Sequence, residues 1–214
     1  MSSCRSFVDL LPRVLCVLVS CVSAWSSCAV ASAGPGFSRK ANIPGIKDAG
    51  RVDDFLYRGG QPSEKGLEEL RRLGVNTIID LRGEWPWEVE KERRHAKSLG
   101  MHFVNMPGNG WTAPSDRQIA EFFRIIQQRP RRRIFVHCWL GGDRSGVFIA
   151  VYRIAFEGWT PEAAIQEMRA YHFKSFLHPN MTAYVRSFPE RLARTPSLAA
   201  FQHLRSRDRT TRIR

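Results

Sequence analysis

The sequence has few cysteines, few acidic residues relative to its basic ones, and no long apolar segment. Four of the five cysteines lie within the first 28 residues, so Cys138 is the single cysteine of the remaining chain. Once a leader is removed, no intramolecular disulfide can form, which excludes a disulfide-stabilised scaffold. A lone thiol in an oxidising compartment indicates a chemical role, and a buried, inert cysteine is the alternative.

The shortage of acids gives 33 basic residues against 20 acidic ones and a formal charge of +13. Seven arginines but one acid, Asp208, occur from Arg191 onward, so +6 of the charge lies in that tail. No alternation of basic and aromatic residues and no nucleic-acid motif accompanies these arginines. We therefore expect no nucleic-acid partner.

Residues 1–33 are predicted to be an export signal. An apolar run, Val14–Val22, follows Arg5 and Arg13, and Ala31-Ser32-Ala33 provides the small-x-small pattern that signal peptidase accepts. We expect cleavage after Ala33 and a periplasmic or secreted protein.

Two other fates of the N-terminus remain open. Leu18-Val19-Ser20-Cys21 resembles a lipoprotein box, which would place a lipid on Cys21. An uncleaved anchor is the second, although the apolar run is shorter than the about 20 residues of a membrane span. Contact with a membrane is expected only through such an uncleaved or lipidated N-terminus.

The remaining chain is predicted to hold one domain over 51–194, between a Gly-, Pro- and Ser-rich linker at 34–50 and a basic tail at 195–214. Strands and helices alternate at short spacing, which predicts an α/β fold with a central, mainly parallel sheet flanked by helices. The predicted strands are 55–58, 75–81, 101–106 and 134–137. The predicted helices are 63–73, 86–99, 115–128, 145–157, one that begins after Thr160, and 180–194.

One loop of this predicted sheet carries the chemistry. An apolar strand delivers Cys138, Gly141 and Gly142 let the chain curl, and an apolar helix begins just after Arg144. Backbone N–H groups that converge at a helix N-terminus form an anion-binding nest. Arg144 adds a bidentate fork for phosphate oxygens, and the same positive field favours the thiolate of Cys138.

The sequence HCWLGGDRSG resembles the phosphate-binding loop of the protein tyrosine and dual-specificity phosphatase superfamily, with its His-Cys-x5-Arg-Ser/Thr signature. YRGGQPSEKGLEELRRLGVNTIIDLRGE and AVYRIAFEGWTPEAAIQEM are similar to segments of bacterial atypical dual-specificity phosphatases, so the resemblance spans about 54–188. It implies a tyrosine phosphatase-like fold, no metal and no cofactor. It also implies roles for individual residues of the loop. Cys138 is then the nucleophile, Ser145 assists the thiolate as leaving group, His137 orders the loop, and phosphate is bound by Arg144 and by the amides of Trp139, Leu140, Gly141, Gly142 and Asp143.

The general acid is less clear, because the family usually supplies an Asp from the loop after the preceding strand. Here that loop, residues 105–114, contains no carboxylate. Two substitutes remain open. Asp143 lies inside the phosphate loop, where it either donates the proton or bonds the loop's own amides. Asp116 falls in the first turn of a helix, where Asp is common for its interaction with the helix dipole alone.

The other polar residues favour structural roles. Asp80 and Arg82, at the end of a buried strand, are expected to form an ion pair, and the histidines show no spacing typical of a metal site. Trp111 either covers the mouth of the pocket or packs on its own domain.

The sequence therefore predicts hydrolysis of phosphate monoesters, by default protein phosphotyrosine and then phosphoserine or phosphothreonine, with a phosphorylated protein or a small phosphate ester as partner. A phosphate-binding pseudophosphatase is the first alternative, because of the carboxylate-free loop. A rhodanese-like sulfurtransferase is the second, and the Arg at the sixth position with the following Ser argues against it.

Overall fold

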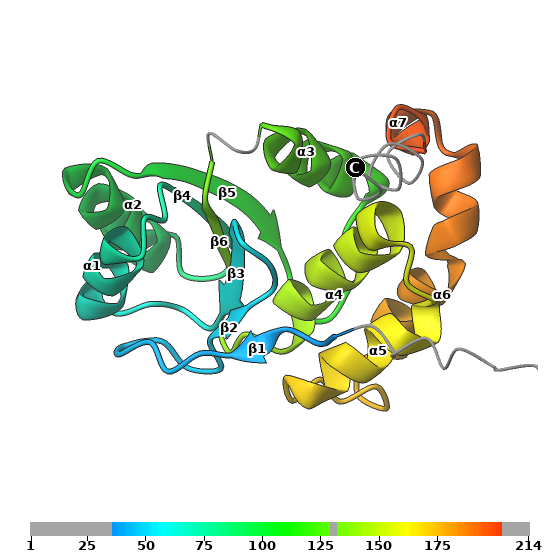
Figure 1. Cartoon of the computed structure of the whole chain (residues 1–214), viewed down its shortest axis with the longest axis horizontal. Helices are drawn as coiled ribbons and strands as arrows, with labels where there is room; N and C mark the ends of the chain where they lie inside the picture. Colours follow the sequence, from blue (N-terminus) through cyan, green and yellow to red (C-terminus); the bar gives the residue numbers. More distant parts are fainter. Residues whose placement is uncertain (1–35, 129–131, 203–214) are drawn as a thin grey trace, which may run out of the picture. The chain divides into compact units, whose positions relative to one another are not determined.

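A twisted sheet organises the computed structural model, which describes residues 36–128 and 132–202 (Figure 1). Its strands lie in the order β1-β2-β3-β6-β4-β5. Four of them run parallel: β3 (Leu56–Gly59), β6 (Ile134–His137), β4 (Thr77–Arg82) and β5 (His102–Gly108). The short strands β1 (Arg39–Lys40) and β2 (Gly50–Arg51) add an antiparallel edge. The predicted α/β fold with a mainly parallel sheet is confirmed.

Helices cover both faces of the sheet (Figure 1). The first face carries α1 (Glu64–Arg72) and α2 (Pro86–Ser98), and the second carries α3 (Asp116–Gln127), α4 (Asp143–Tyr152), α5 (Pro161–Ala170) and α6 (Pro179–Arg194). A π-helical turn, Arg153–Glu157, extends α4, and α7 (Pro196–Ala199) follows α6. Side chains of β4 alternate between the two cores, with Ile78 on the first face and Ile79 on the second. Because the core lies on both sides, every residue of β4 is buried.

The helix boundaries follow from capping residues. The Ser63 hydroxyl accepts the Gly66 N–H at 3.2 Å, and the Thr160 hydroxyl accepts the Ala163 N–H at the same distance. Ser115 and Gln118 form a reciprocal capping box at the start of α3. These caps satisfy N–H groups that a helix start leaves unpaired, so the predicted helix starts after 63, 115 and 160 are confirmed.

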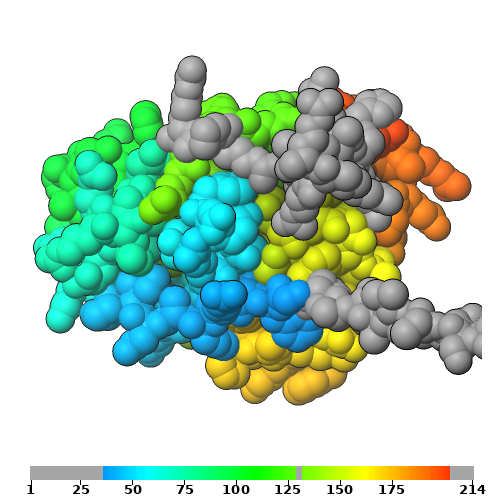
Figure 2. Space-filling model, in the orientation of Figure 1, coloured from blue at the N-terminus to red at the C-terminus, as the bar shows by residue number. Residues whose placement is uncertain are grey.

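The predicted linker at 34–50 is wrong for its second part. Ser38 is buried, and its N–H and hydroxyl bond the Glu167 carboxylate of α5 at 2.6 and 2.7 Å. Figure 2 shows this segment in blue on the surface beside α5 in yellow. Ile43 and Ile46 enter the core of the first face. The Gly and Pro content here marks turns within the domain, because the neighbouring apolar side chains are buried.

The boundary of the predicted basic tail is also too early. Leu198 of α7 and Phe201 are buried in the core of the second face, and the Phe201 ring lies 5.2 Å from that of Phe123. The domain therefore extends to at least residue 201. The expected signal at 1–33 and the arginines beyond residue 202 lie outside the described residues. Among the residues described, no helix combines the length and apolar character that a membrane crossing requires.

Candidate active site

The parallel strands β3, β6, β4 and β5 end at one edge of the sheet, and the loop from β6 into α4 leaves that edge (Figure 1). Cys138 follows β6 directly and is 2% exposed. Its Sγ atom accepts the Gly141 N–H at 3.3 Å, so the chain curls back over the sulfur as the predicted nest requires. Helix α4 then begins at Asp143, which places its N-terminal dipole beside the sulfur.

Gly141 makes the tight curl of this loop. Its φ is +89°, in the region that L-residues rarely adopt, and an added Cβ would lie 2.6 Å from the carbonyl carbon of Gly59 and the nitrogen of Gly60. The loop therefore rests directly on the end of β3. A side chain at 141 would displace the loop that holds Cys138.

Arg144 is anchored by acceptors at the ends of β4 and β5 and in the loop that follows β4. Its Nη1 donates to the Gly108 carbonyl at 2.9 Å and to the Leu81 carbonyl at 3.2 Å. Both Nη atoms donate to the Glu84 carboxylate at 2.7 Å, as an end-on bidentate pair. This contact holds the pKa of Glu84 down at about 2. Burial acts to lower the pKa of Arg144, but Glu84 and the charge of Cys138 outweigh it and raise that pKa.

A second guanidinium, that of Arg58 on β3, lies beneath the loop. It is fully buried, its Nη2 donates to the Gly141 carbonyl at 2.8 Å, and its carbon sits 3.9 Å from the centre of the Tyr171 ring. Burial lowers the pKa of Arg58, and the charge of Cys138 is among those that oppose this effect. The sulfur thus lies close to two buried cations, Arg144 and Arg58.

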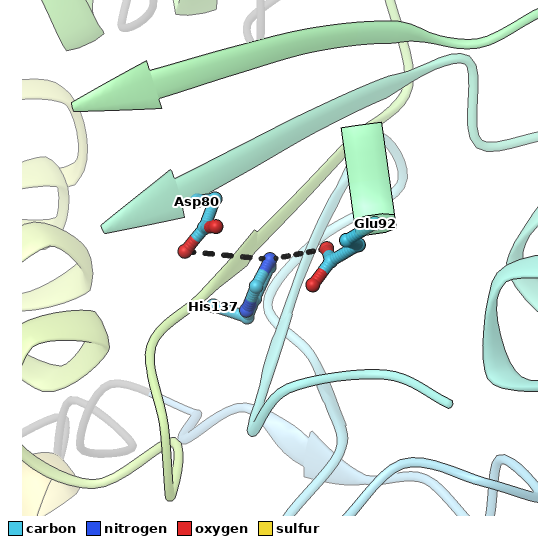
Figure 3. A group of neighbouring side chains, drawn as sticks. All are labelled: Asp80, Glu92 and His137. Atoms are coloured by element: carbon cyan, nitrogen blue, oxygen red, sulfur yellow. Dashed lines mark ion pairs between the residues drawn. The ribbon is translucent and has the colours of Figure 1, made fainter. Parts of the chain in front are cut away.

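Buried charged groups surround His137 on the face of the sheet that α2 covers (Figure 3). Its Nε2 lies 2.8 Å from Glu92 Oε1 on α2 and 3.9 Å from Asp80 Oδ1 on β4. Its Nδ1 faces the Cys138 carbonyl at 3.2 Å. Burial alone would lower the pKa of His137, but Glu92 and Asp80 outweigh it, and the pKa is raised. The imidazole therefore lies between these carboxylates and the backbone of the nucleophile.

Three of these groups, Asp80, Glu92 and His137, are close enough together to ligate a metal ion. Their carboxylates already bind a cation, however, because Arg82 Nη2 lies 2.8 Å from Asp80 Oδ2 and 2.6 Å from Glu92 Oε2. The Arg82 guanidinium thus occupies the space between the two carboxylates, and the raised pKa of His137 adds to the positive side of the cluster. The predicted ion pair of Asp80 and Arg82 is confirmed, as part of this larger cluster.

Asp143, the first residue of α4, is half-buried at the mouth of the loop. Its Oδ1 lies 3.6 Å from Nε2 of His178. Burial raises the pKa of Asp143, and the charges of His178, Arg144 and Lys174 oppose the rise. A carboxyl with a raised pKa retains its proton closer to neutral pH, as a general acid must.

Asp116 has other partners. Its Oδ1 accepts the Tyr184 hydroxyl at 2.8 Å, and its Oδ2 lies 3.1 Å from Nη1 of Arg191 and 3.3 Å from the Thr195 hydroxyl. These contacts attach the start of α3 to α6. They also raise the pKa of Tyr184, after the larger effect of burial on that hydroxyl.

The remaining predicted residues lie in the loop or beside it. The Ser145 hydroxyl is buried and donates to the Gly59 carbonyl at 3.4 Å. Trp139 and Leu140 expose their side chains at the top of the loop. Trp111 is exposed, with its ring 5.4 Å from that of His178. Next to Arg144, a cavity of about 240 Å³ opens between the 107–114 loop and α4.

Sequence reasoning missed three residues of this arrangement: Arg58, Glu84 and Glu92. Each lies 46 or more positions from Cys138 in the chain, so no local spacing connects it to the loop. Glu84 and Arg58 do occur within the YRGGQP…DLRGE segment that carries the resemblance, which was the available signal.

A thiol in an amide nest, with an arginine six residues later at a helix N-terminus, defines the site of a cysteine-dependent phosphatase. The chain belongs to the family described as DSP-PTPase phosphatase fused to NAD+ kinase, whose model matches residues 45–185. That range covers about two thirds of the chain, including all of the loop.

Known proteins agree with this assignment. The dual specificity protein phosphatase TpbA of Pseudomonas aeruginosa (strain UCBPP-PA14) is 28% identical over 120 residues, which cover 56% of this chain and 52% of TpbA. The chain thus spans about half the length of this curated relative. A crystal structure of P. aeruginosa TpbA matches with a TM-score of 0.62 and 26% identity, over 77% of this chain and 98% of that one. A TpbA variant in complex with pTyr matches with a TM-score of 0.61 and 20% identity, over 82% and 99%.

Proposed function

We propose that this chain hydrolyses phosphate monoesters through a phosphocysteine intermediate. The observation that supports this most directly is the Gly141 N–H bonded to Cys138 Sγ at the start of α4, with Arg144 held at the same loop by Glu84. A phosphate bound there receives backbone N–H groups and a guanidinium, and the sulfur lies beneath it.

The contacts of Arg144 leave part of its fork free for a ligand. A guanidinium has five N–H donors. Glu84 and the two carbonyls engage Nη1 and one donor of Nη2. The Nε–H and the second Nη2–H then form a side edge that matches two phosphate oxygens. Glu84 acts as a positioning residue, because it orients this edge without touching the substrate.

The reaction proceeds in two displacements. The Cys138 thiolate attacks phosphorus, an S–P bond forms, and the P–O ester bond breaks. The departing oxygen takes a proton from Asp143, so the alcohol or phenol leaves neutral. Water then attacks the phosphocysteine, gives up a proton to the Asp143 carboxylate, and releases inorganic phosphate and the thiolate. The Ser145 hydroxyl stabilises the thiolate as it departs.

Asp143 is proposed as the general acid in preference to Asp116. Asp143 lies in the loop itself and has a raised pKa, whereas both oxygens of Asp116 are occupied by groups of α6 and by the following residue Thr195. With its oxygens held by these partners, Asp116 fastens α3 to α6 instead of facing the phosphate loop.

Phosphotyrosine is the proposed default substrate, with phosphoserine and phosphothreonine next. A structure of the similar protein TpbA holds pTyr, which supports a phosphorylated substrate for this fold. A phosphorylated protein or a small phosphate ester is thus the expected partner.

The second candidate is a pseudophosphatase that binds phosphate without turnover. The carboxylate-free 105–114 loop favours it, because the usual position of the acid is empty. Asp143 provides an alternative donor, which weakens this candidate. Among the described residues, no feature favours the sulfurtransferase alternative.

The test is hydrolysis of para-nitrophenyl phosphate by the purified chain and by Cys138→Ser. The hydroxyl of Ser is a far weaker nucleophile than a thiolate, so we expect a loss of at least about a thousandfold. Phosphate binding by Cys138→Ser, measured by calorimetry, should persist. A wild-type chain that binds phosphate but releases no para-nitrophenol would be the pseudophosphatase.

We further propose export to the periplasm or beyond, on the strength of the N-terminal pattern at 1–33 alone. Mass spectrometry of the expressed protein should find a mature N-terminus at Gly34. A diacylated or acylated Cys21 would instead support the lipoprotein alternative, and an intact Met1 on exported protein would support the uncleaved anchor. An intact Met1 on protein that stays in the cytoplasm would contradict export.

A further inference from the structure

Exposed apolar side chains are concentrated at one place on the described residues. Nine large hydrophobic side chains of the described residues are exposed, and seven of them belong to the phosphate loop or to segments that contact it. We refer to these seven as the rim: Trp85, Trp87, Trp111, Trp139, Leu140, Phe176 and Leu177. The most exposed are Phe176 at 78%, Trp111 at 69% and Trp87 at 66%. Isolated exposed apolar residues need no explanation, but a concentration around a site does.

Four separate segments contribute the rim, and contacts connect each to the phosphate loop. Trp139 and Leu140 belong to the loop itself. The Trp85 ring lies 4.7 Å from the Trp139 ring, at the start of α2. Trp111, after β5, has its ring 5.4 Å from that of His178, which in turn lies 3.6 Å from Asp143. Phe176 and Leu177 immediately precede His178. The segments that carry the rim therefore lie beside the phosphate loop.

The amount of apolar surface is large for a monomeric protein. With about 200 Å² for each fully exposed side chain, the rim totals on the order of 800 Å². The largest apolar patch on a typical soluble monomer is about 300–600 Å². An apolar partner at this face would remove that surface from water.

The composition and charge of the rim favour a lipid surface over a peptide. Four of the seven residues are Trp, the side chain most typical of the bilayer interface. The rim comes from four separate segments of the chain and is exposed to solvent, which suits a planar apolar layer better than one extended chain. Lys47 and Lys174 are exposed, and neither has an ion pair among the described side chains. The Lys47 carbonyl accepts the N–H of Gly60, which borders the loop, and the charge of Lys174 acts on Asp143. Two free cations beside an apolar rim match an anionic membrane.

We propose that the rim seats the active site on a membrane, and that a lipid whose headgroup ends in a phosphomonoester is a substrate there beside the default phosphotyrosine. This rests on the proposed function, since the same loop would bind the lipid phosphate. It departs from the sequence expectation that the chain meets a membrane only through an uncleaved or lipidated N-terminus. The rim enters the interface of the bilayer, Lys47 and Lys174 approach anionic headgroups, and the phosphate reaches the nest above Cys138.

The experiment compares one headgroup in two physical states. The substrates are phosphatidic acid in phosphatidylcholine vesicles and short-chain phosphatidic acid dissolved as monomers, with para-nitrophenyl phosphate and a phosphotyrosyl peptide in parallel. The proteins are the wild-type chain, Trp87→Ser with Phe176→Ser, and the control Leu73→Ser. Leu73 is 41% exposed but lies before β4, at the opposite edge of the sheet. Vesicle binding is measured separately by co-sedimentation.

We expect the wild-type chain to sediment with the vesicles and to hydrolyse bilayer phosphatidic acid at least about tenfold more efficiently than the monomer. The double variant should lose about tenfold on the bilayer substrate, yet remain within about twofold of wild type on para-nitrophenyl phosphate. Leu73→Ser should match wild type on every substrate.

Three results would overturn the proposal. The first is that the wild-type chain stays in the supernatant. The second is that Leu73→Ser loses as much activity on the bilayer substrate as the rim variant does. The third is that the rim variant loses activity only on the phosphotyrosyl peptide. The last result would make the rim a protein-docking surface. Failure of the proposed function is distinct, because a chain inactive on para-nitrophenyl phosphate can still be tested for rim-dependent sedimentation.

Discussion

Charged groups surround the phosphate loop on two levels, and the two levels differ in their access to water. Beneath the loop, Asp80, Arg82, Glu92 and His137 are all buried and paired with one another. At the mouth, Glu84 and Asp143 are about a third exposed. Buried, mutually neutralised charges are fixed in place, whereas a partly exposed carboxyl can exchange a proton with a substrate. The comparison suggests that the lower level sets geometry and the upper level does the proton chemistry.

The largest expected effect is at the upper level. Asp143→Asn removes the proposed acid, so hydrolysis of alkyl phosphates should fall by about 10²–10⁴ in kcat, while aryl phosphates, whose leaving groups need no proton, should lose much less. The raised pKa of Asp143 should appear as loss of alkyl phosphate hydrolysis on the alkaline side of the pH profile, and that limb should vanish in the variant. Asp116→Asn is the matched control. Equal slowing of both substrate classes by Asp143→Asn would remove it from the acid role.

The next effect tests the lower level. Glu92→Gln leaves Arg82 and His137 with one carboxylate fewer in a buried site, which should cost about 3 kcal/mol of unfolding free energy, measured by urea denaturation. Activity should fall equally for alkyl and aryl phosphates, because geometry and not proton transfer is affected. Glu90→Gln, an exposed position on the same helix, should leave both quantities unchanged.

The same cluster should make stability depend on pH. Because the pKa of His137 is raised in the folded chain, its contribution to stability is fully present below the unfolded value of about 6.5 and is lost as pH rises through the folded pKa. Glu92→Gln should reduce this alkaline loss. An identical pH dependence of unfolding in both proteins would show that His137 is not charged by Glu92.

A smaller effect is expected for Glu84, which orients Arg144 from the mouth. Glu84→Gln keeps a hydrogen bond but removes the charge-assisted pair, so kcat/KM for para-nitrophenyl phosphate should fall by about tenfold. The loss should be the same for alkyl phosphates, and unfolding should change little because Glu84 is partly exposed. An increase in phosphate affinity would instead identify Glu84 as a competitor for Arg144.

The smallest effect concerns Lys174, whose charge opposes the raised pKa of Asp143. Lys174→Gln should move the alkaline limb of alkyl phosphate hydrolysis to higher pH, with little change in the maximal rate. Lys47→Gln, the other free cation near the loop, should leave the limb in place. If Lys174→Gln leaves the midpoint of the alkaline limb unchanged, that midpoint is not set by the pKa of Asp143.

Sequence reasoning predicted the elements with strong local signals. The β-branched run at 75–81 and the Ser and Thr caps place their strand and helices through interactions between near neighbours. The pairing of Cys138 with Arg144 was also predictable, because the strand, the two glycines and the helix that bring them together follow one another directly in the sequence. Residues 38–50 were assigned to a linker because local composition does not reveal that Ser38 binds Glu167, 129 positions away.

The site was predictable only where its parts are local. Glu84 reaches Arg144 across 60 positions and Arg58 reaches Gly141 across 83, and both contacts exist only because β3, β4 and β6 end at one edge. The assignment of Asp143 over Asp116 likewise depended on their neighbours. The sequence placed Asp143 inside the phosphate loop and Asp116 in the first turn of a predicted helix and left both open as the acid, and the proposal for Asp143 rests on three-dimensional contacts.

The contact between Gly141 and the end of β3 bears on the order of assembly. Gly59 and Gly60 precede Gly141 by some 80 positions, yet the backbone segments touch. A fragment that contains only β6 and α4 therefore lacks the surface on which its loop rests, and should acquire neither the loop's shape nor its affinity for phosphate. During synthesis, the loop can therefore bind phosphate only after the newly made β6–α4 segment has packed onto β3, which is made much earlier.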